Sequence, residues 1–576
     1  MKKAKLNKEQ RQRSFNGRCY FVAFLLVAGA VGLFSRAVYL QVVNEAFLEK
    51  QADARHIRVA QLPAYRGTIT DRNGEVLAVS TPVDSIWANP QILLESPGQI
   101  APLAKLLGQK TKDLNAKLSR NSSKEFVYLK RHMNPTDAEE VIAKNVPGVY
   151  VQREYRRYYP AGEVTGHLLG FTNIDDQGQE GLELAFDHRL AGSPGKKKVL
   201  KDKFGRFVED IEAIKAPHNG QEIITSLDLR IQYLAYRSLK GAVQKHKAKA
   251  GTAVVVDVHS GEVLAMVNQP TYNPNNRASF QASHFRNRAI TDIFEPGSSF
   301  KPLVIAAALE TGEYKANSRI DTSPGWIKVG PKQIKDKKNH GRMSMATLLH
   351  KSSNVGATKI AMDLESEDLW NVLSRFGVGQ STASGIHGES AGLFSHYSNW
   401  RPIAKATLGY GYGVSVTALQ LAQAYAVFGN GGLQRPVSLV RVEQAPIARR
   451  VVQPEVADAV LGMMEGVTQT GGTGTRAAIT GYRVAGKTGT SLKAAAGGYA
   501  EKTYTAVFAG LVPVSNPRLA VVVIVDEPSA GEYYGGSVSA PVFADIASGA
   551  MRILAVPPDD THSVRGPNLT LAEVAP

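Results

Sequence analysis

The sequence has very little cysteine: Cys19 is the single thiol among 576 residues. This excludes an intramolecular disulfide and a metal site built from several thiolates. The chain also lacks a glycine-rich phosphate loop of the Walker type and internal repeats, so nucleotide hydrolysis has no support. His167 has no neighbours at metal-ligand spacing and is interpreted as a structural histidine. We predict no metal and no organic cofactor.

Acidic residues are outnumbered: 68 Lys and Arg stand against 51 Asp and Glu, a formal net charge of +17. Such an excess fits nucleic acid, an anionic membrane surface or an anionic polymer as partner. Much of it is local, because residues 2–18 hold seven basic side chains and one acidic one. A second basic run at Lys196–Lys198 is interpreted as a solvated loop, with an anion site as the alternative. No nucleic-acid partner is predicted.

A long uncharged stretch, residues 19–35, follows the basic N-terminus, and a second apolar stretch begins after Arg36. Together they are long enough to cross a bilayer, which takes about 20 helical residues. A cleaved signal peptide is the alternative, but no small-x-small cleavage site followed by a polar start is evident. We therefore predict a retained single-pass anchor at 19–42. The basic segment 1–18 favours a cytoplasmic N-terminus, with the remaining chain across the membrane.

The remaining chain divides into parts of different texture. Residues 43–225 mix short strands and turns, and Asn73-Gly74 predicts a type I′ hairpin turn. Residues 226–556 alternate between amphipathic helices and apolar strands. The tail, 557–576, loses periodicity and is expected to be disordered.

Within residues 226–556, strands are predicted at both ends with helices between them. This order is typical of an antiparallel sheet packed by a helical lobe, an α+β layout with a cleft between the sheet edge and the lobe. The predicted strands are 252–258, 262–267, 482–491, 504–514 and 518–526. The predicted helices are 229–247, 298–310, 353–364, 366–376, 417–428 and 454–469.

The strongest local motif is residues 295–302, a turn that runs directly into an apolar helix. A spacing of three places the Ser298 and Lys301 side chains on one helical face, within reach of each other. A serine hydroxyl is a weak nucleophile until a base removes its proton, and a lysine is such a base when its amine is partly neutral. Burial and a second nearby cation shift the amine toward the neutral form. Because a bare Ser-x-x-Lys also arises by chance, this motif alone is weak.

A second motif, Ser352-Ser353-Asn354, opens another predicted helix. Serine and asparagine at such a position are commonly helix caps, which is the alternative interpretation. In the functional interpretation, the Ser352 hydroxyl relays a proton between Lys301 and the leaving amine. Asn354 then holds a substrate amide and Lys301 in register.

A third motif, residues 487–490 (KTGT), lies inside a predicted strand. Glycine within a strand often marks the close approach of another backbone, so an extended peptide is predicted to pair along this exposed edge. Lys487 and the hydroxyls of Thr488 and Thr490 are predicted to bind a substrate carboxylate. The Lys487 charge is also expected to lower the pKa of Lys301. If the motif stood alone, a turn that joins two strands would be the favoured interpretation.

The three motifs occur in one order: Ser-x-x-Lys at a helix start, Ser-x-Asn next, and Lys-Thr-Gly on a late strand. This trio is typical of penicillin-binding proteins and class A β-lactamases. Residues 66–75 (RGTITDRNGE) and 156–162 (RRYYPAG), with the later HLLGF and GLE, resemble the pedestal blocks of class B penicillin-binding proteins. The chain resembles that family from anchor to last strand. FEPGSSFKP, KSSNVG, VAGKTGT and VDEP are most similar to its division-specific septal transpeptidases.

The resemblance implies a pedestal at 43–225 and a transpeptidase domain at 226–556, periplasmic and anchored in the bacterial inner membrane. It implies that Ser298 attacks the bond between the two terminal D-alanines of a stem peptide. An amine of a neighbouring stem peptide then resolves the acyl-enzyme, and β-lactams acylate the same serine. The implied partners are peptidoglycan stem peptides, a glycan polymerase of the FtsW type and other divisome membrane proteins.

The resemblance also assigns roles to individual residues. The predicted catalytic residues are Ser298, Lys301, Ser352, Asn354 and Lys487. The predicted substrate-binding residues are Thr488, Gly489, Thr490, Tyr412, Tyr504, Tyr533 and Tyr534. For the four tyrosines, surface or packing aromatics are the alternative to an acceptor or β-lactam pocket. The backbone N–H groups of Ser298 and Thr490 are the expected oxyanion donors.

Two other functions remain open from the sequence. A D,D-carboxypeptidase or β-lactamase shares the fold but passes the acyl group to water, although such hydrolases do not need a long pedestal or a permanent anchor. A β-lactam sensor or divisome scaffold shares the fold without the reaction. For a pure scaffold, Lys301, Ser352 and Lys487 together are superfluous.

Overall fold

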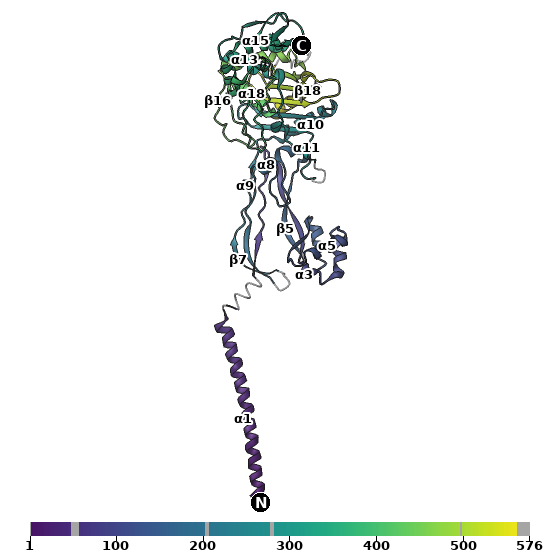
Figure 1. Ribbon diagram of the computed structural model, residues 1–576, viewed down its shortest axis with the longest axis vertical. Coiled ribbons are helices and arrows are strands. Elements are labelled where there is room, and N and C mark those ends of the chain that lie inside the picture. The colour runs from purple at the N-terminus through teal and green to yellow at the C-terminus, as the bar shows by residue number, and fades with distance from the viewer. Residues whose placement is uncertain are drawn as a thin grey trace, which may run out of the picture. The chain divides into compact units, whose positions relative to one another are not determined.

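The computed structural model describes residues 2–45, 47, 57–201, 207–276, 281–495 and 498–560. The chain forms two compact units (Figure 1). The first unit is Met1–Ala64, Val83–Glu154 and Ser193–Asn219, and the second is Tyr65–Pro82, Tyr155–Gly192 and Gly220–Pro576. The part of the predicted disordered tail from 561 to 576 lies outside the described residues.

The N-terminal helix α1 (Lys2–Val38) continues into a π-helical segment, Tyr39–Val43. Within the described part of the chain, Phe15–Val43 is the one helical stretch long and apolar enough to span a membrane. Its apolar side chains are exposed: Phe24 by 67% and Leu26 by 71%. Because water penalises such exposure, the helix fits the predicted single membrane anchor.

The first unit contains a small antiparallel sheet and several short helices. This sheet has the strand order β1-β6-β7, and the basic run Lys196–Lys198 lies in its central strand. The predicted solvated loop is therefore wrong, because β6 pairs on both sides while Lys198 still reaches Glu212 at 2.7 Å. The strands are β1 (Ile57–Leu62), β6 (Gly195–Lys201), β7 (Phe207–Lys215) and β4 (Val127–Met133). The helices are α3 (Pro90–Leu93), α4 (Ile100–Leu106), α5 (Thr111–Arg120) and α6 (Pro135–Ile142).

The predicted hairpin near residue 73 is present, between β2 (Ile69–Thr70) and β3 (Val76–Ala88). Its turn is not type I′, because that turn needs a positive φ at both central residues and only Gly74 has one, at +91°. The fully buried Asp71 carboxylate closes the loop instead. Within the loop it accepts two backbone N–H hydrogen bonds, from Asn73 at 2.7 Å and from Glu75 at 2.9 Å, and it accepts a third from Leu229 at 3.1 Å.

A buried ionic cluster lies next to this hairpin in the second unit. The Glu183 carboxylate accepts hydrogen bonds from Arg66 Nε and Arg157 Nε, both at 2.6 Å. All three side chains are at most 1% exposed. A second carboxylate, Asp187, pairs with Arg66 at 2.7 Å. The neighbouring helices are α7 (Gly166–Leu169), α8 (Gly181–Ala185) and α9 (Asp187–Leu190), and the strands are β5 (Val149–Tyr158) and β8 (Ile223–Ile224).

A five-stranded antiparallel sheet forms the centre of the second unit, in the order β10-β9-β19-β18-β17. Helices α10 (Leu229–Lys245) and α20 (Gly535–Ile553) cover one face, and α13 (Lys301–Glu310), α18 (Ala418–Gly429) and α19 (Pro454–Thr468) cover the other (Figure 1). Along β9, Val255 packs in the core on the α10 and α20 face of the sheet. Its neighbours Val254 and Val256 pack in the core on the opposite face, with α13, α18 and α19. Burial on both faces explains why these strands are continuously apolar. The strands are β9 (Ala250–Asp257), β10 (Val263–Gln269), β17 (Ala485–Ala495), β18 (Gly498–Val512) and β19 (Leu519–Asp526).

The predicted α+β architecture is confirmed. The helix predicted from residue 298 begins instead at Lys301, because residues 297–300 form a 3₁₀ turn. The helices are α10 (Leu229–Lys245), α11 (Ala282–Phe285), α12 (Arg288–Thr291), α13 (Lys301–Glu310), α14 (Met345–Lys351), α15 (Asn354–Asp363), α16 (Ser366–Arg375), α17 (Pro402–Leu408), α18 (Ala418–Gly429), α19 (Pro454–Thr468) and α20 (Gly535–Ile553). Short strand pairs are β11 (Arg319–Asp321) with β14 (Arg342–Ser344), β12 (Trp326–Val329) with β13 (Lys332–Lys335), and β15 (Leu433–Gln434) with β16 (Arg449–Arg450).

Candidate active site

The turn that carries Ser298 is held from both sides. Gly297, at φ +53°, donates its N–H to the Gly411 carbonyl at 3.0 Å. On the other side, the Ser491 hydroxyl of β17 donates to the Glu295 carbonyl at 2.7 Å. Ser298 Oγ itself makes no hydrogen bond with any described residue and lines a cavity of about 760 Å³. The turn is therefore rigid while its hydroxyl stays available.

The Glu295 side chain adds a second tie to the same turn. One carboxylate oxygen accepts hydrogen bonds from the Gly413 N–H at 2.8 Å and the Tyr499 hydroxyl at 3.2 Å. Burial raises the pKa of Glu295. This carboxylate thus joins three segments around Ser298: its own, the loop after α17 and strand β18.

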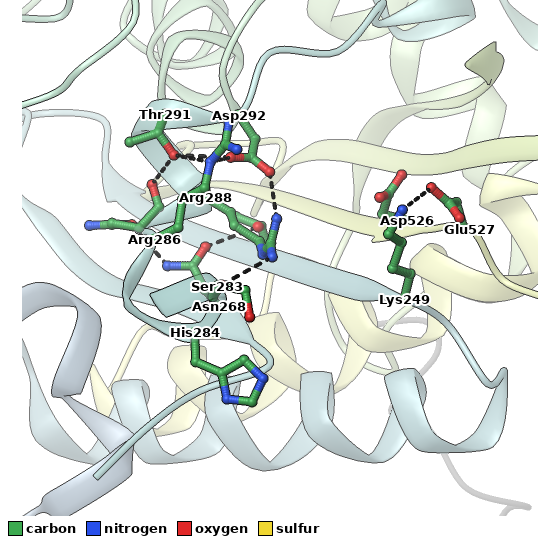
Figure 2. Close-up of polar contacts among 12 residues, drawn as sticks. Lys249, Asn268, Ser283, His284, Arg286, Arg288, Thr291, Asp292, Asp526 and Glu527 are labelled. Carbon is green, nitrogen blue, oxygen red and sulfur yellow. Dashed lines mark hydrogen bonds and ion pairs between the residues drawn. The ribbon is translucent and has the colours of Figure 1, made fainter. Parts of the chain in front are cut away.

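Ion pairs lie in and near the segment that leads into the Ser298 turn (Figure 2). Asp292 accepts from Arg288 at 2.8 Å and also pairs with Arg286. Lys249 forms a further ion pair with Glu527 at 3.0 Å. Arg288 and Asp292 line a separate cavity of about 290 Å³. The first two pairs join residues within 286–292, and the Lys249 pair joins the residues that flank β9 and β19.

Lys301 is fully buried and points at the second motif. Its Nζ donates to the Ser352 carbonyl at 2.7 Å, to Ser352 Oγ at 3.2 Å and to Asn354 Oδ1 at 2.7 Å. Burial is the main cause that holds the pKa of Lys301 well below its usual range, and the charge of Lys487 adds to it. Among the described residues, Lys301 Nζ makes no hydrogen bond to Ser298, with which the spacing had predicted a shared helical face. Catalytic hydrogen bonds often shorten only when substrate binds.

The two interpretations of the second motif apply to different serines: Ser353 is a helix cap, and Ser352 contacts Lys301. Ser353 is the N-cap of α15, and its Oγ accepts the Gly356 N–H at 2.9 Å. Ser352 ends α14 in the left-handed conformation, at φ +60°. Non-glycine residues rarely adopt this conformation, and such strain is common at functional sites. Ser353 therefore caps the helix, and the Ser352 hydroxyl remains free of capping and contacts Lys301 and Lys487.

Lys487 completes the contact between the motifs. It is fully buried in β17, and its Nζ donates to Ser352 Oγ at 3.0 Å. Burial lowers the pKa of Lys487 to about 7. Ser352 Oγ therefore lies between two lysine amines, and two charged ammonium groups this close repel each other. This arrangement favours a neutral Lys301 beside a charged Lys487.

β17 is an edge strand of the sheet, as the sequence predicted. Alternate N–H and C=O groups of an edge strand point away from the sheet and can pair with an added chain. A Cβ on Gly489 would lie 2.6 Å from the Pro296 carbonyl oxygen, so only glycine lets the nucleophile turn approach this closely. Thr488 Oγ1 lies 2.8 Å from Thr473 Oγ1, and Thr490 Oγ1 accepts the Gly535 N–H at 3.0 Å.

The cavity brings together half of the predicted site residues. Its walls include Ser298, Ser352, Asn354, Thr488, Thr490 and Tyr534. Tyr504 and Tyr533 stack at 4.2 Å and line a neighbouring cavity, which Tyr533 joins to the first through its 4.4 Å contact with Tyr534. Tyr412 lines neither cavity, and its hydroxyl accepts the Leu492 N–H at 3.2 Å.

Sequence reasoning missed Asp336. Its carboxylate accepts the N–H groups of Asn354 at 2.6 Å and Val355 at 3.1 Å, and it also takes the Ser353 hydroxyl hydrogen bond. Its charge acts on Lys301 against the causes that lower that pKa. An acid alone in a basic run, KQIKDKKNH, was the available signal. Nothing in the spacing linked it to Ser353.

The comparisons with known proteins agree with this geometry. A family model described as the penicillin binding protein transpeptidase domain matches residues 251–548, and one described as the penicillin-binding protein dimerisation domain matches residues 61–225. The chain belongs to the penicillin-binding protein family that combines these two domains.

Individual relatives match nearly the full length. The chain is 43% identical over 570 residues to "Peptidoglycan D,D-transpeptidase FtsI" of Escherichia coli K12, which covers 96% of each chain. A solved peptidoglycan synthetase from Bifidobacterium adolescentis is similar with a TM-score of 0.69 at 27% identity, over 89% of this chain and 98% of that one. The transpeptidase domain of Burkholderia pseudomallei penicillin-binding protein 3 is similar with a TM-score of 0.54 at 42% identity, over 58% and 97%.

Proposed function

We infer that this chain is a serine-type peptidoglycan D,D-transpeptidase, which cross-links stem peptides through an acyl-enzyme. The observation that carries this function is one cavity lined by Ser298, Ser352 and Thr488, with the buried Lys301 amine behind it. The relatives named as peptidoglycan D,D-transpeptidases support the reaction class.

In the proposed first step, Ser298 Oγ attacks the carbonyl carbon between the two terminal D-alanines. Its proton passes to the neutral Lys301 amine, and the N–H groups of Ser298 and Thr490 stabilise the oxyanion. The C–N bond then breaks. The leaving D-alanine amine takes the proton from Lys301 through the Ser352 hydroxyl.

In the second step, an acceptor amine attacks the ester carbonyl. Its proton returns along the same route, the ester C–O bond breaks, and Ser298 Oγ is regenerated as the cross-link forms. Lys487 and the hydroxyls of Thr488 and Thr490 bind the substrate carboxylate, Asn354 orients a substrate amide, and Gly489 lets the edge strand pair with the peptide. We assign Tyr412, Tyr504, Tyr533 and Tyr534 to the pocket walls.

We further propose a pedestal at 43–225 and a transpeptidase domain at 226–556. The family-model matches at 61–225 and 251–548 support these boundaries. The septal role, the inner-membrane location, the cytoplasmic N-terminus and the FtsW-type partner rest on the motif resemblance and on the basic segment before the anchor.

Intact-mass measurement after treatment with benzylpenicillin tests the proposed function. We expect one adduct, located by fragmentation to Ser298, which persists for minutes because the site retains the acyl group for an amine. Loss of the adduct within seconds would instead identify a hydrolase. An unmodified protein would favour the scaffold.

Asp336→Asn is expected to shift the acidic limb of the acylation pH profile to lower pH. The Asp336 charge raises the pKa of Lys301. Base catalysis needs the neutral Lys301 amine. Removal of the Asp336 charge lowers the pKa of Lys301, so the amine stays neutral and active at lower pH. Lys487→Met is the matched counterpart: it removes a charge that lowers this pKa, so its limb moves to higher pH. The measurement is the second-order acylation rate of each variant across pH, and limbs that move together contradict the assignment.

A further inference from the structure

The cavity that holds Ser298 has a cationic wall outside the three motifs. We define this cationic wall as Lys335, Lys337, Lys338, Lys351 and Arg476, all of which line the cavity and are exposed. The one acidic residue in the same lining is Asp336. Its carboxylate is occupied by the α15 N-terminus.

The wall is poorly neutralised by the protein itself. In the part of the chain that the structure describes, none of its four lysines forms an ion pair, whereas Arg476 has Glu532 at 3.4 Å. Lys337 Nζ lies 4.4 Å from the Tyr534 ring centroid, and Lys351 donates to the Gly471 carbonyl at 3.0 Å. These contacts hold the cations in place without cancelling their charge, which fits an anionic ligand.

Asp336 also fixes where the wall stands. Lys335 and Lys337 flank it in sequence, and its hydrogen bonds attach this loop to Asn354. Across the cavity, Arg476 donates to the Ser537 carbonyl at 3.3 Å, beside the segment whose Thr473 touches Thr488. The wall therefore surrounds the Thr488 end of β17.

This end of β17 is the side of the leaving group. In the proposed reaction, the terminal carboxylate of the donor binds the hydroxyls of Thr488 and Thr490. The leaving D-alanine therefore departs toward Thr488, and the retained acyl peptide extends toward Leu492. By microscopic reversibility, the acceptor amine enters where the leaving amine departed. The rest of the acceptor then lies against the cationic wall.

We propose that the cationic wall binds carboxylates of the acceptor stem peptide, at positions remote from its reacting amine. This inference rests on the proposed function and names the chemistry of its second substrate: an acidic peptide. Charge complementarity orients such an acceptor and speeds its encounter with the acyl-enzyme. Salt weakens exposed charge pairs, so the preference should decline as ionic strength rises.

The test compares two acceptor peptides that differ only in their remote carboxylates, free in one and converted to amides in the other. The purified full-length chain is acylated with a thioester donor, and the ratio of aminolysis to hydrolysis is measured by chromatography. This ratio does not depend on how fast the acyl-enzyme forms. The variant is Lys337→Gln with Lys338→Gln. The charge-matched control is Lys245→Gln with Lys315→Gln, two exposed lysines outside the cavity.

The wild type and the control are expected to favour the free-carboxylate acceptor about fivefold, because exposed charge pairs contribute modestly. In the Lys337/Lys338 variant, we expect the two acceptors to become equal through loss with the acidic one alone. A wild type that does not distinguish the acceptors, or a variant that lowers both equally, overturns the proposal. A wild type that forms no acyl-enzyme, or gives hydrolysis alone, overturns the transpeptidase function instead.

Discussion

Lys301→Met is expected to slow the acylation of Ser298 by a penicillin about 10³-fold, the middle of the range for loss of a general base. Methionine fills the buried space with a chain of similar length but has no lone pair that accepts a proton from serine. The variant also loses the hydrogen bonds to Ser352 and Asn354 that set the register of the two motifs. The measurement is the second-order rate of labelling by a fluorescent penicillin.

Two variants bracket this result. Ser298→Ala defines zero label, and Lys315→Met, at an exposed lysine outside the cavity, should match the wild type. Thermal unfolding of each variant checks that the fold survives. If Lys301→Met kept a tenth of the wild-type rate while folded, another group would have to be the base.

Glu183→Ala is expected to have the largest effect on folding. It leaves the guanidinium groups of Arg66 and Arg157 buried without the carboxylate that both contact at 2.6 Å. Removing one partner from a buried ionic cluster costs about 3–5 kcal/mol, a large part of the roughly 5–15 kcal/mol that holds a typical domain folded. We expect a clear fall in Tm of the purified protein, or loss of folded protein from the membrane.

The control for this prediction is Lys249→Ala, which breaks the exposed ion pair with Glu527 in the same unit (Figure 2). Surface pairs contribute little because water already solvates both charges. The two variants should therefore differ strongly in Tm. Equal values would mean that solvent reaches Glu183 and that its burial is not a source of stability.

Local chemistry explains what the sequence could predict of the fold. Strands β9 and β19 and helix α10 follow from periodicity, and the structure has them within a few residues of the predicted bounds. The type of the turn after β2 was predicted wrongly, because the buried Asp71 carboxylate determines the turn conformation by accepting the Asn73 N–H. The helix at Ser298 begins later than predicted because Gly297 bonds to the distant Gly411.

The site shows the same limit. Ser298, Ser352 and Lys487 were found because their three motifs occur in the order typical of one family. In the structure, the amines of Lys301 and Lys487 both contact the Ser352 hydroxyl. Asp336 and the cationic wall could not be found this way. Their relation to the motifs is made through space, by a loop that folds back on α15, and no residue spacing encodes it.

The close approach at Gly489 has an evolutionary consequence. A side chain at this position would clash with the Pro296 carbonyl oxygen, so Gly489 cannot be substituted without displacing the turn that carries Ser298. In the proposed function, a peptide also pairs along the main chain of this edge strand, which side-chain substitution leaves unaltered. We therefore expect resistance substitutions in the residues that line the cavity around this strand. There, a substitution can weaken inhibitor binding and still preserve cross-linking of the cell wall.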